Sequence, residues 1–135
     1  MSFSSETVEL TTGSRAAVVD LTGVVTDFCR GKGDGLLSVF IPHATAGVAI
    51  IEVGAGSDDD LLGAVDDLLP ADDRWRHSHG TPGHGRDHVL PAFISPSLTV
   101  PVVNGSPALG TWQSIVLVDT NRDNLQRQVR LSFLG

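Results

Sequence analysis

The feature that most constrains the fold is a series of short apolar or alternating segments separated by turn-forming residues. Residues 7–10 and 126–133 alternate between polar and apolar side chains, a period of two that predicts strands. Residues 36–41 and 48–51 are apolar on both faces, as is typical of central strands. Further strands are predicted at residues 16–21, 98–103 and 111–118.

Two helices are predicted between these strands. Thr22 can cap a helix that ends at the glycines near residue 31. A second helix is predicted with Ser57 or Asp58 as its N-cap; it carries leucines and a valine at helical spacing and stops at Pro70. Its aspartates 58–60 fit the positive end of the helix dipole better than a metal site. Many short strands with two or three helices predict an α+β fold, mostly antiparallel, in one compact domain spanning residues 1–135.

Composition excludes several classes of protein. With a single cysteine, Cys29, no intramolecular disulfide can form, which favours a reducing, cytoplasmic location and an inert buried thiol. The opening segment lacks the basic and apolar regions of a signal peptide, and no window has the roughly 18 apolar residues of a membrane helix. A formal net charge of −7 argues against binding to nucleic acid.

A polar loop from residue 71 to 85 interrupts the strands, and loops of this length are more often functional than accidental. It opens a stretch that contains four of the five histidines. They are His77, His79, His84 and His88. Neutral imidazole is a common metal ligand, and catalytic zinc sites use three protein ligands with one open position. A solvent-exposed histidine-rich loop with incidental metal affinity is the alternative.

Three other places carry candidate functional residues. His43 precedes small residues that leave room for a ligand, although it equally fits a structural histidine. Glu52 follows the strand at 48–51 and fits either a general base, a partner of a ligating imidazole, or a surface carboxylate. Trp112 is explained by core packing, whereas Gln113 is less easily explained in that way.

These segments, in this order, resemble the secondary thiamine-phosphate synthase (YjbQ-like) family over about residues 5–134. Residues 43–47 (His-Ala-Thr-Ala-Gly) with Glu52 are similar to the family's His-Thr-Thr-Ala-Gly…Glu signature, with Ala44 in place of a threonine. Residues 97–102 and 109–113 match closely, and His88 resembles the histidine of an Asn-Ala-x-His-Leu-Lys segment without the lysine.

The resemblance implies a homotrimer and an activity that couples a pyrimidine diphosphate to a thiazole phosphate. It implies a divalent metal, zinc-type rather than Mg²⁺ because of the histidines, and a small phosphorylated substrate. The expected metal ligands are His43, His77 and His88. The expected catalytic residues are Glu52, Asp87 and Gln113, and the expected substrate-binding residues are Thr45, Gly47, Arg86 and Trp112.

Two alternatives remain open at this point. The first is a non-catalytic module that binds a metal or a small molecule. The second is a metal-assisted hydrolase in which Glu52 or Asp87 activates a water. Arg86, Arg122 and Arg127 are candidates for holding a phosphate, since the chain has no Gly-rich phosphate loop.

Overall fold

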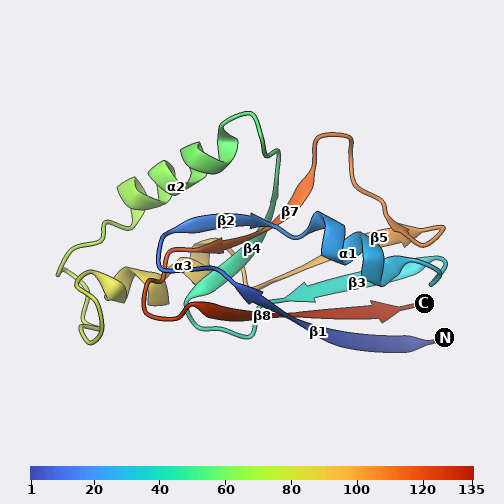
Figure 1. Cartoon of the computed structure of the whole chain (residues 1–135), viewed down its shortest axis with the longest axis horizontal. Coiled ribbons are helices and arrows are strands. Elements are labelled where there is room, and N and C mark those ends of the chain that lie inside the picture. The colour runs from blue at the N-terminus through green and yellow to red at the C-terminus, as the bar shows by residue number, and fades with distance from the viewer.

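A computed structural model describes the whole chain, residues 1–135 (Figure 1). Eight strands form two sheets, and three α-helices accompany them. This confirms the predicted α+β class with mostly antiparallel strands. The strands are β1 (Phe3–Thr11), β2 (Ala17–Asp20), β3 (Gly35–Phe40), β4 (Ala46–Ile51), β5 (Ser97–Val103), β6 (Ser106–Pro107), β7 (Ser114–Asp119) and β8 (Gln126–Leu134). The helices are α1 (Thr22–Cys29), α2 (Ser57–Leu68), α3 (Leu90–Phe93) and a short 3₁₀ helix, η1 (His84–His88).

Both predicted helices form, but their starts differ from prediction. α2 begins after Gly56, whose φ of 102° suits a glycine, so neither Ser57 nor Asp58 is the capping residue. At α1 the Thr22 hydroxyl accepts a hydrogen bond from the Ile115 amide instead of capping the helix. η1 and α3 were not predicted, because each is too short for a helical period to emerge. None of the helices has the length and apolar character needed to cross a membrane.

The larger sheet has the strand order β1-β8-β3-β5-β6, and the smaller sheet has the order β2-β7-β4. All neighbouring strands are antiparallel. β1 pairs with β8 over nine residues, from Phe3 opposite Leu134 to Thr11 opposite Gln126. This long pairing explains why both strands extend beyond the alternating segments visible in the sequence.

The main core lies between the two sheets and α1. Leu37 and Val39 of β3 and Ile115 and Leu117 of β7 point into it and are fully buried. The other face of β7 packs under α2 and α3, where Val65, Leu69, Leu90, Val116 and Val118 form a second cluster. β7 is therefore buried on both faces, as a continuous apolar run indicates.

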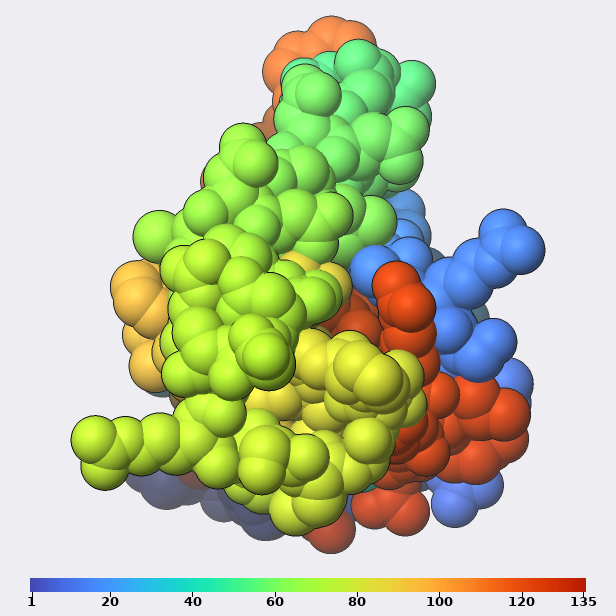
Figure 2. All heavy atoms as spheres, turned by 90° about the vertical axis from the view of Figure 1, so that its left-hand side faces the viewer, coloured from blue at the N-terminus to red at the C-terminus, as the bar shows by residue number.

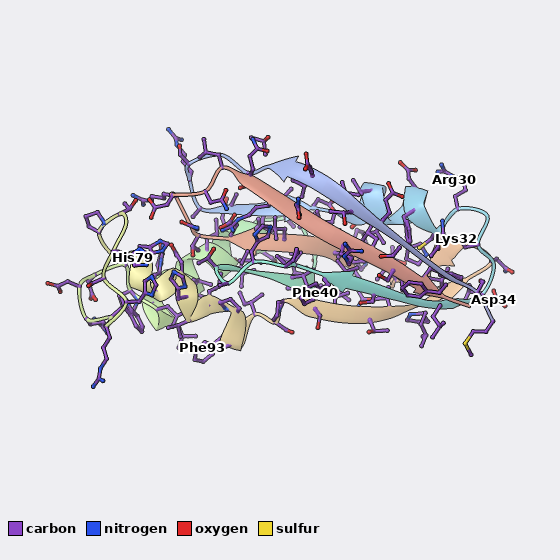
Figure 3. All side chains as sticks on the ribbon, turned by 90° about the horizontal axis from the view of Figure 1, so that it is seen from below. Arg30, Lys32, Asp34, Phe40, His79 and Phe93 are labelled. Carbon is purple, nitrogen blue, oxygen red and sulfur yellow. The ribbon has the colours of Figure 1, made fainter.

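The strand β3 differs from this expectation although it lies inside the larger sheet. Its residues Leu36 and Phe40 are 51% and 41% exposed, because the face opposite the core has no covering element. In Figure 3 the labelled Phe40 lies on this strand. It is between the two ends of the molecule, one of which carries His79 and the other Arg30, Lys32 and Asp34. The apolar run in the sequence did not reveal that one face of β3 is exposed.

The pairing of β4 with β7 defines two ends of the molecule. Ala46 lies opposite Asp119 at one end, and Ile51 lies opposite Ser114 at the other. The chain from the end of α2 to η1 lies beside the turn that joins β7 to β8. Figure 2 shows it as yellow and yellow-green atoms between green α2 and the red segment that leads into β8.

Candidate metal centre

The segment from Leu69 to His88, here called the histidine loop, is held against the body of the protein by its own local contacts. The indole N–H of Trp75 donates to the Pro70 carbonyl at 2.8 Å, and the His84 amide donates to the Thr81 carbonyl at 2.9 Å. Gly85 packs directly on Trp75 and on the His77 carbonyl, so a side chain at position 85 would collide with both. These contacts turn η1 back onto the earlier part of the loop.

This turn brings four imidazoles together. The ligand nitrogens of His77, His79 and His84 all lie within 4.8 Å of one another. His88 joins them, with its Nε2 2.9 Å from the Nε2 of His84 and its ring centroid 3.7 Å from that of His77. We call His77, His79 and His84 the metal centre and treat His88 as its neighbour. In Figure 3 the labelled His79 lies among these rings at one end of the molecule.

The metal centre has properties that a divalent ion would satisfy. His77 Nε2 is buried and has no hydrogen-bond partner, which is unusual for a buried polar atom. Burial and the neighbouring imidazoles lower the pKa of His77 and also that of His88. Both effects favour neutral imidazole, which is the form that binds a metal. The residues therefore fit a zinc-type ion.

Two carboxylates approach the Nδ1 of His84 from the body of the protein. Asp123 Oδ2 lies 3.1 Å from this nitrogen and Asp87 Oδ2 lies 3.4 Å from it. A carboxylate in this position orients a ligating imidazole and raises its basicity. Asp123 also accepts hydrogen bonds from the amide and the hydroxyl of Thr81, and these bonds lower the pKa of its carboxyl group. It thus connects the histidine loop to the turn after β7.

Asp87 is in a different environment from Asp123. Its side chain is almost fully buried and accepts a hydrogen bond of 2.5 Å from the Thr120 hydroxyl. Burial raises the pKa of the Asp87 carboxyl, although Thr120 and the Arg86 guanidinium oppose this effect. A buried carboxyl with a raised pKa beside a histidine cluster is a candidate acid or base. The structure therefore places the predicted catalytic Asp87 next to the metal centre.

The predicted substrate residue Arg86 is engaged within the protein. Its Nη1 donates to Asp66 Oδ1 at 2.5 Å and to the Leu69 carbonyl at 3.2 Å, which ties η1 to the end of α2. Arg122 instead lines a cavity of about 120 Å³ beside His84, together with Asp87 and other polar residues. A second cavity of about 170 Å³ lies on the side of Trp75 and His77.

The structure leaves His43 outside this group. Its Nε2 accepts a hydrogen bond of 2.8 Å from the Gln128 amide at the start of β8. Of the predicted ligands His43, His77 and His88, the last two meet within the chain and His43 does not; His79 and His84 lie beside His77 as well. His43 lines a separate polar cavity, here called the His43 basin, with Glu9, Asn124, Gln126, Arg127 and Gln128.

Thr45 and Gly47, which were predicted to bind substrate, have structural contacts. The buried Thr45 hydroxyl oxygen accepts hydrogen bonds from Arg127 Nη2 at 2.8 Å and from Asn121 Nδ2 at 3.1 Å. Gly47 lies against the Ile94 carbonyl, where a Cβ would have no room. The small residues after His43 therefore serve the packing of β4 and leave no space for a ligand.

Glu52, Trp112 and Gln113 lie at the other end of β4 and β7. β4 separates His43 from Glu52 by about 16 Å or more at the usual rise per residue. Within the chain, Glu52 therefore cannot act as the partner of the His43 imidazole, because the two residues flank opposite ends of the same strand. Gln113 Oε1 accepts a hydrogen bond from the Gly110 amide at 2.8 Å, and Trp112 is 73% exposed instead of packed in the core.

Sequence reasoning missed Asp123 and Thr120 as members of the site. Both lie in the turn after β7, more than 30 residues from the histidine loop, and no spacing rule connects them to it. The hydrophilic run 119–124 directly after an apolar strand was the one available signal. Its contacts with the loop depend on the tertiary fold.

Comparisons with known proteins agree with this architecture. The family model described as "UPF0047 protein YjbQ-like" matches residues 6–135. The UPF0047 protein Rv2556c of Mycobacterium tuberculosis is 64% identical over 121 residues, which cover 90% of this chain and 91% of the relative. The UPF0047 protein sll1880 of Synechocystis is 37% identical and covers 88% and 77% of the two chains.

Solved structures also show this fold. The crystal structure of the hypothetical protein APE1520 from Aeropyrum pernix K1 has a TM-score of 0.88 and 31% identity, with 98% of each chain covered. A YbjQ-like protein from Sulfolobus solfataricus P2 has a TM-score of 0.91 at 23% identity, covering 99% and 98% of the two chains, and shows the same fold. From the family model and the identities above, this chain belongs to the YjbQ-like UPF0047 family.

Proposed function

We propose that this chain is a metal-dependent enzyme whose centre is a zinc-type ion held by His77, His79 and His84. The observation that carries the proposal is the convergence of three ligand nitrogens within 4.8 Å, together with a buried Nε2 on His77 that has no hydrogen-bond partner. Imidazole ligands favour zinc and related transition metals over Mg²⁺, which prefers oxygen ligands. Three protein ligands leave a coordination position for a substrate, as in catalytic zinc sites.

The substrate class we propose is a small phosphorylated molecule. An ion at this centre would act as a Lewis acid on a substrate oxygen. Asp87 is placed to give or take a proton, since its raised pKa and its contact with Thr120 hold a buried carboxyl beside His84. Arg122, which lines the cavity next to His84, supplies a cation for the phosphate. The cavities of about 120 and 170 Å³ suit a phosphoryl group rather than a large ligand.

Among phosphate reactions we favour metal-assisted hydrolysis. The coupling of a pyrimidine diphosphate to a thiazole phosphate, implied by the family resemblance, is the second candidate. It requires charge neutralisation of a leaving pyrophosphate, and Arg122 is the one arginine that lines the cavity without an ion pair in the structure. The histidine-rich donor set favours hydrolysis because most diphosphate chemistry uses Mg²⁺ on oxygen ligands.

We further propose that the chain assembles into a homotrimer through one end of the uncovered face of the larger sheet, the end that carries Phe3, Leu36 and Leu134. Phe3 and Leu36 both lie opposite Leu134 in the strand register, so the three form a continuous apolar row, and Val103 is exposed on the same sheet. Exposed apolar patches of this kind mark contact sites between proteins. Light scattering should give three chain masses, and Leu36→Asp should lower the mass toward one.

A cytoplasmic location without nucleic-acid partners completes the proposal. The single thiol, Cys29, is buried and its pKa is raised by that burial, so it is unreactive and forms no disulfide. The net charge of −7 disfavours contact with phosphate backbones. Fractionation of cells that express the untagged chain would test the location.

Metal analysis of protein purified without an affinity tag tests the central proposal. We expect about one zinc-type ion per chain, and we expect removal of this ion by a chelator to abolish turnover of small phosphomonoesters. Asp87→Asn should retain the metal and lower turnover by roughly two orders of magnitude. Asp67→Asn, an exposed carboxylate of α2 that lines neither cavity, is the matched control.

Two results would decide against the enzyme. If the protein had its full metal content but did not turn over phosphomonoesters or the thiamine precursors, it would be a non-catalytic metal-binding module. Metal-free protein that shows the same turnover as the loaded protein would remove the metal from the reaction.

A further inference from the structure

The His43 basin is a second cavity that the metal centre does not use. It has a volume of about 540 Å³ and is open to solvent, since Glu9, Asn124, Gln126 and Gln128 are exposed. It is lined entirely by polar or charged residues, with no apolar side chain. These residues come from β1, from the segment before β4, and from the turn and strand around β8. Long-range strand pairing has therefore assembled them in one place.

The protonation state of His43 follows from its hydrogen bond. Because Nε2 accepts the Gln128 N–H at 2.8 Å, this nitrogen carries no proton. The proton of the neutral ring is then on Nδ1, which can donate it to a ligand. Burial and the Arg127 charge both lower the pKa of His43, which keeps the ring neutral. His43, which lines the basin, is thus a hydrogen-bond donor through its Nδ1.

The charges around the basin disfavour an anion. Arg127 is fully buried, and its Nε and Nη2 donate to the two oxygens of Asp119 at 2.6 and 2.9 Å, so the pair has no net charge. Glu9 lies opposite Gln128 in the strand register and forms no ion pair. The uncompensated charge at the cavity is therefore negative.

The amide side chains supply further donors. Gln126 Oε1 accepts the Thr11 hydroxyl at 3.2 Å, and Asn124 Oδ1 accepts the Gln126 amide at 3.1 Å. These bonds use the oxygens and leave the two NH₂ groups to donate to a ligand. Gln128 can both donate and accept through its side chain. The cavity thus offers several donors and, at Glu9, a strong acceptor.

We propose that the His43 basin binds a small neutral polyhydroxylated compound, such as a monosaccharide or cyclic polyol, independently of the metal. A hydroxyl group donates and accepts at once, so a ligand with several hydroxyls matches both Glu9 and the N–H donors. An anion would be repelled by the unpaired charge of Glu9, and an apolar molecule would have no apolar side chain to contact.

Titration of ¹⁵N-labelled, metal-free protein with D-ribose, D-glucose and myo-inositol tests this proposal. We expect saturable shifts of the Gln126 and Gln128 side-chain amides for at least one of the three compounds, with the same affinity after zinc is added. Glu9→Ala should weaken that binding by about tenfold, the scale of one lost hydrogen bond to a charged group. Glu6→Ala, on the opposite face of β1, should leave the affinity unchanged.

Three outcomes would overturn the proposal. The first is the absence of saturable shifts up to about 50 mM of each compound, beyond the weak end of specific binding. The second is tighter binding of inorganic phosphate than of any polyol. The third is an equal effect of Glu9→Ala and Glu6→Ala. Since the titration uses metal-free protein, none of these results bears on the metal centre.

Discussion

The metal centre and the His43 basin lie on either side of the turn that follows β7, and they are built in opposite ways. The three histidines of the metal centre fall within eight consecutive residues and meet because one short loop folds back on itself. The basin takes residues from positions 9, 43, 124 and 126–128, which the β1–β8 pairing and the hydrogen bond between His43 and Gln128 bring together. A local cluster is visible in a sequence, whereas a site assembled across a sheet is not.

The two regions also share a wall, formed by residues 119–123, which contact both of them. Asp119 binds Arg127 at the edge of the basin, and Asp123 and Thr120 bind the histidine loop and Asp87 on the other side. Asn121 connects them, since its amide donates to Asp119 and its Oδ1 accepts the Asp123 amide. One short segment therefore positions both regions. Variants on either side of it can be compared for their effects on folding and on metal binding.

The largest effect is expected from the buried ion pair of this wall. Arg127→Ala leaves Asp119 buried without its partner and should lower the free energy of unfolding by about 3–5 kcal/mol. Arg130→Ala, three residues further along the same strand and exposed, should cost about 0–1 kcal/mol. Urea denaturation of both variants measures the difference, and equal costs would contradict the structural role of Arg127.

The next effect concerns the metal and separates the two histidine regions directly. His84→Ala removes a buried ligand of the metal centre and should lower zinc affinity by about 100-fold or more. His43→Ala should keep the full metal content, because His43 lies in the basin. Competition with a chromogenic chelator gives both affinities. Equal losses in the two variants would mean that a second copy of the chain brings His43 to the centre.

A smaller effect is the pH dependence of stability in the metal-free protein. The pKa of His77 and that of His88 lie below the ordinary value of 6.5 in the folded state, so the unfolded chain binds more protons as the pH falls. Stability should be complete above pH 6.5 and should decrease as the pH falls from there toward the folded pKa values. The double change His77→Gln and His88→Gln should flatten this slope between pH 7 and pH 6 in thermal melts.

The same melts sharpen the comparison between the regions. The pKa of His43 is lowered too, so His43→Gln should remove a separate part of the slope. Because His43 and the two loop histidines belong to different regions, their contributions should add. A slope that stays unchanged in both variants would contradict the lowered pKa values.

The smallest effect is expected at the far end of β4. Glu52→Gln should leave metal content and turnover close to those of the unchanged protein, since Glu52 is separated from the metal centre by the length of the strand. Asp87→Asn provides the contrast at the other end. A loss of turnover in Glu52→Gln comparable to that of Asp87→Asn would place Glu52 in a site completed by a neighbouring copy.

Much of the fold could be predicted from the sequence, because apolar periodicity and turn residues act locally. Both main helices and seven of the eight strands were expected at the positions where they form. Strand lengths and short helices could not be predicted: residues 3–6, for example, extend β1 because they pair with β8 and not because of a pattern of their own. Exposure also depends on the fold: Trp112 is at the surface, and β3 is covered on one face only.

The sequence by itself determined the α+β class, the position of the histidine loop, and the neighbourhood of His77, His84 and Asp87, because residues close along a chain stay close in space. Only the tertiary structure decided that His43 stands apart, that Asp123 supports His84, and that Glu52 lies at the opposite end of β4. The physical reason is that strand pairing fixes which ends of distant segments meet, and hydrogen-bond register is a property of two strands together.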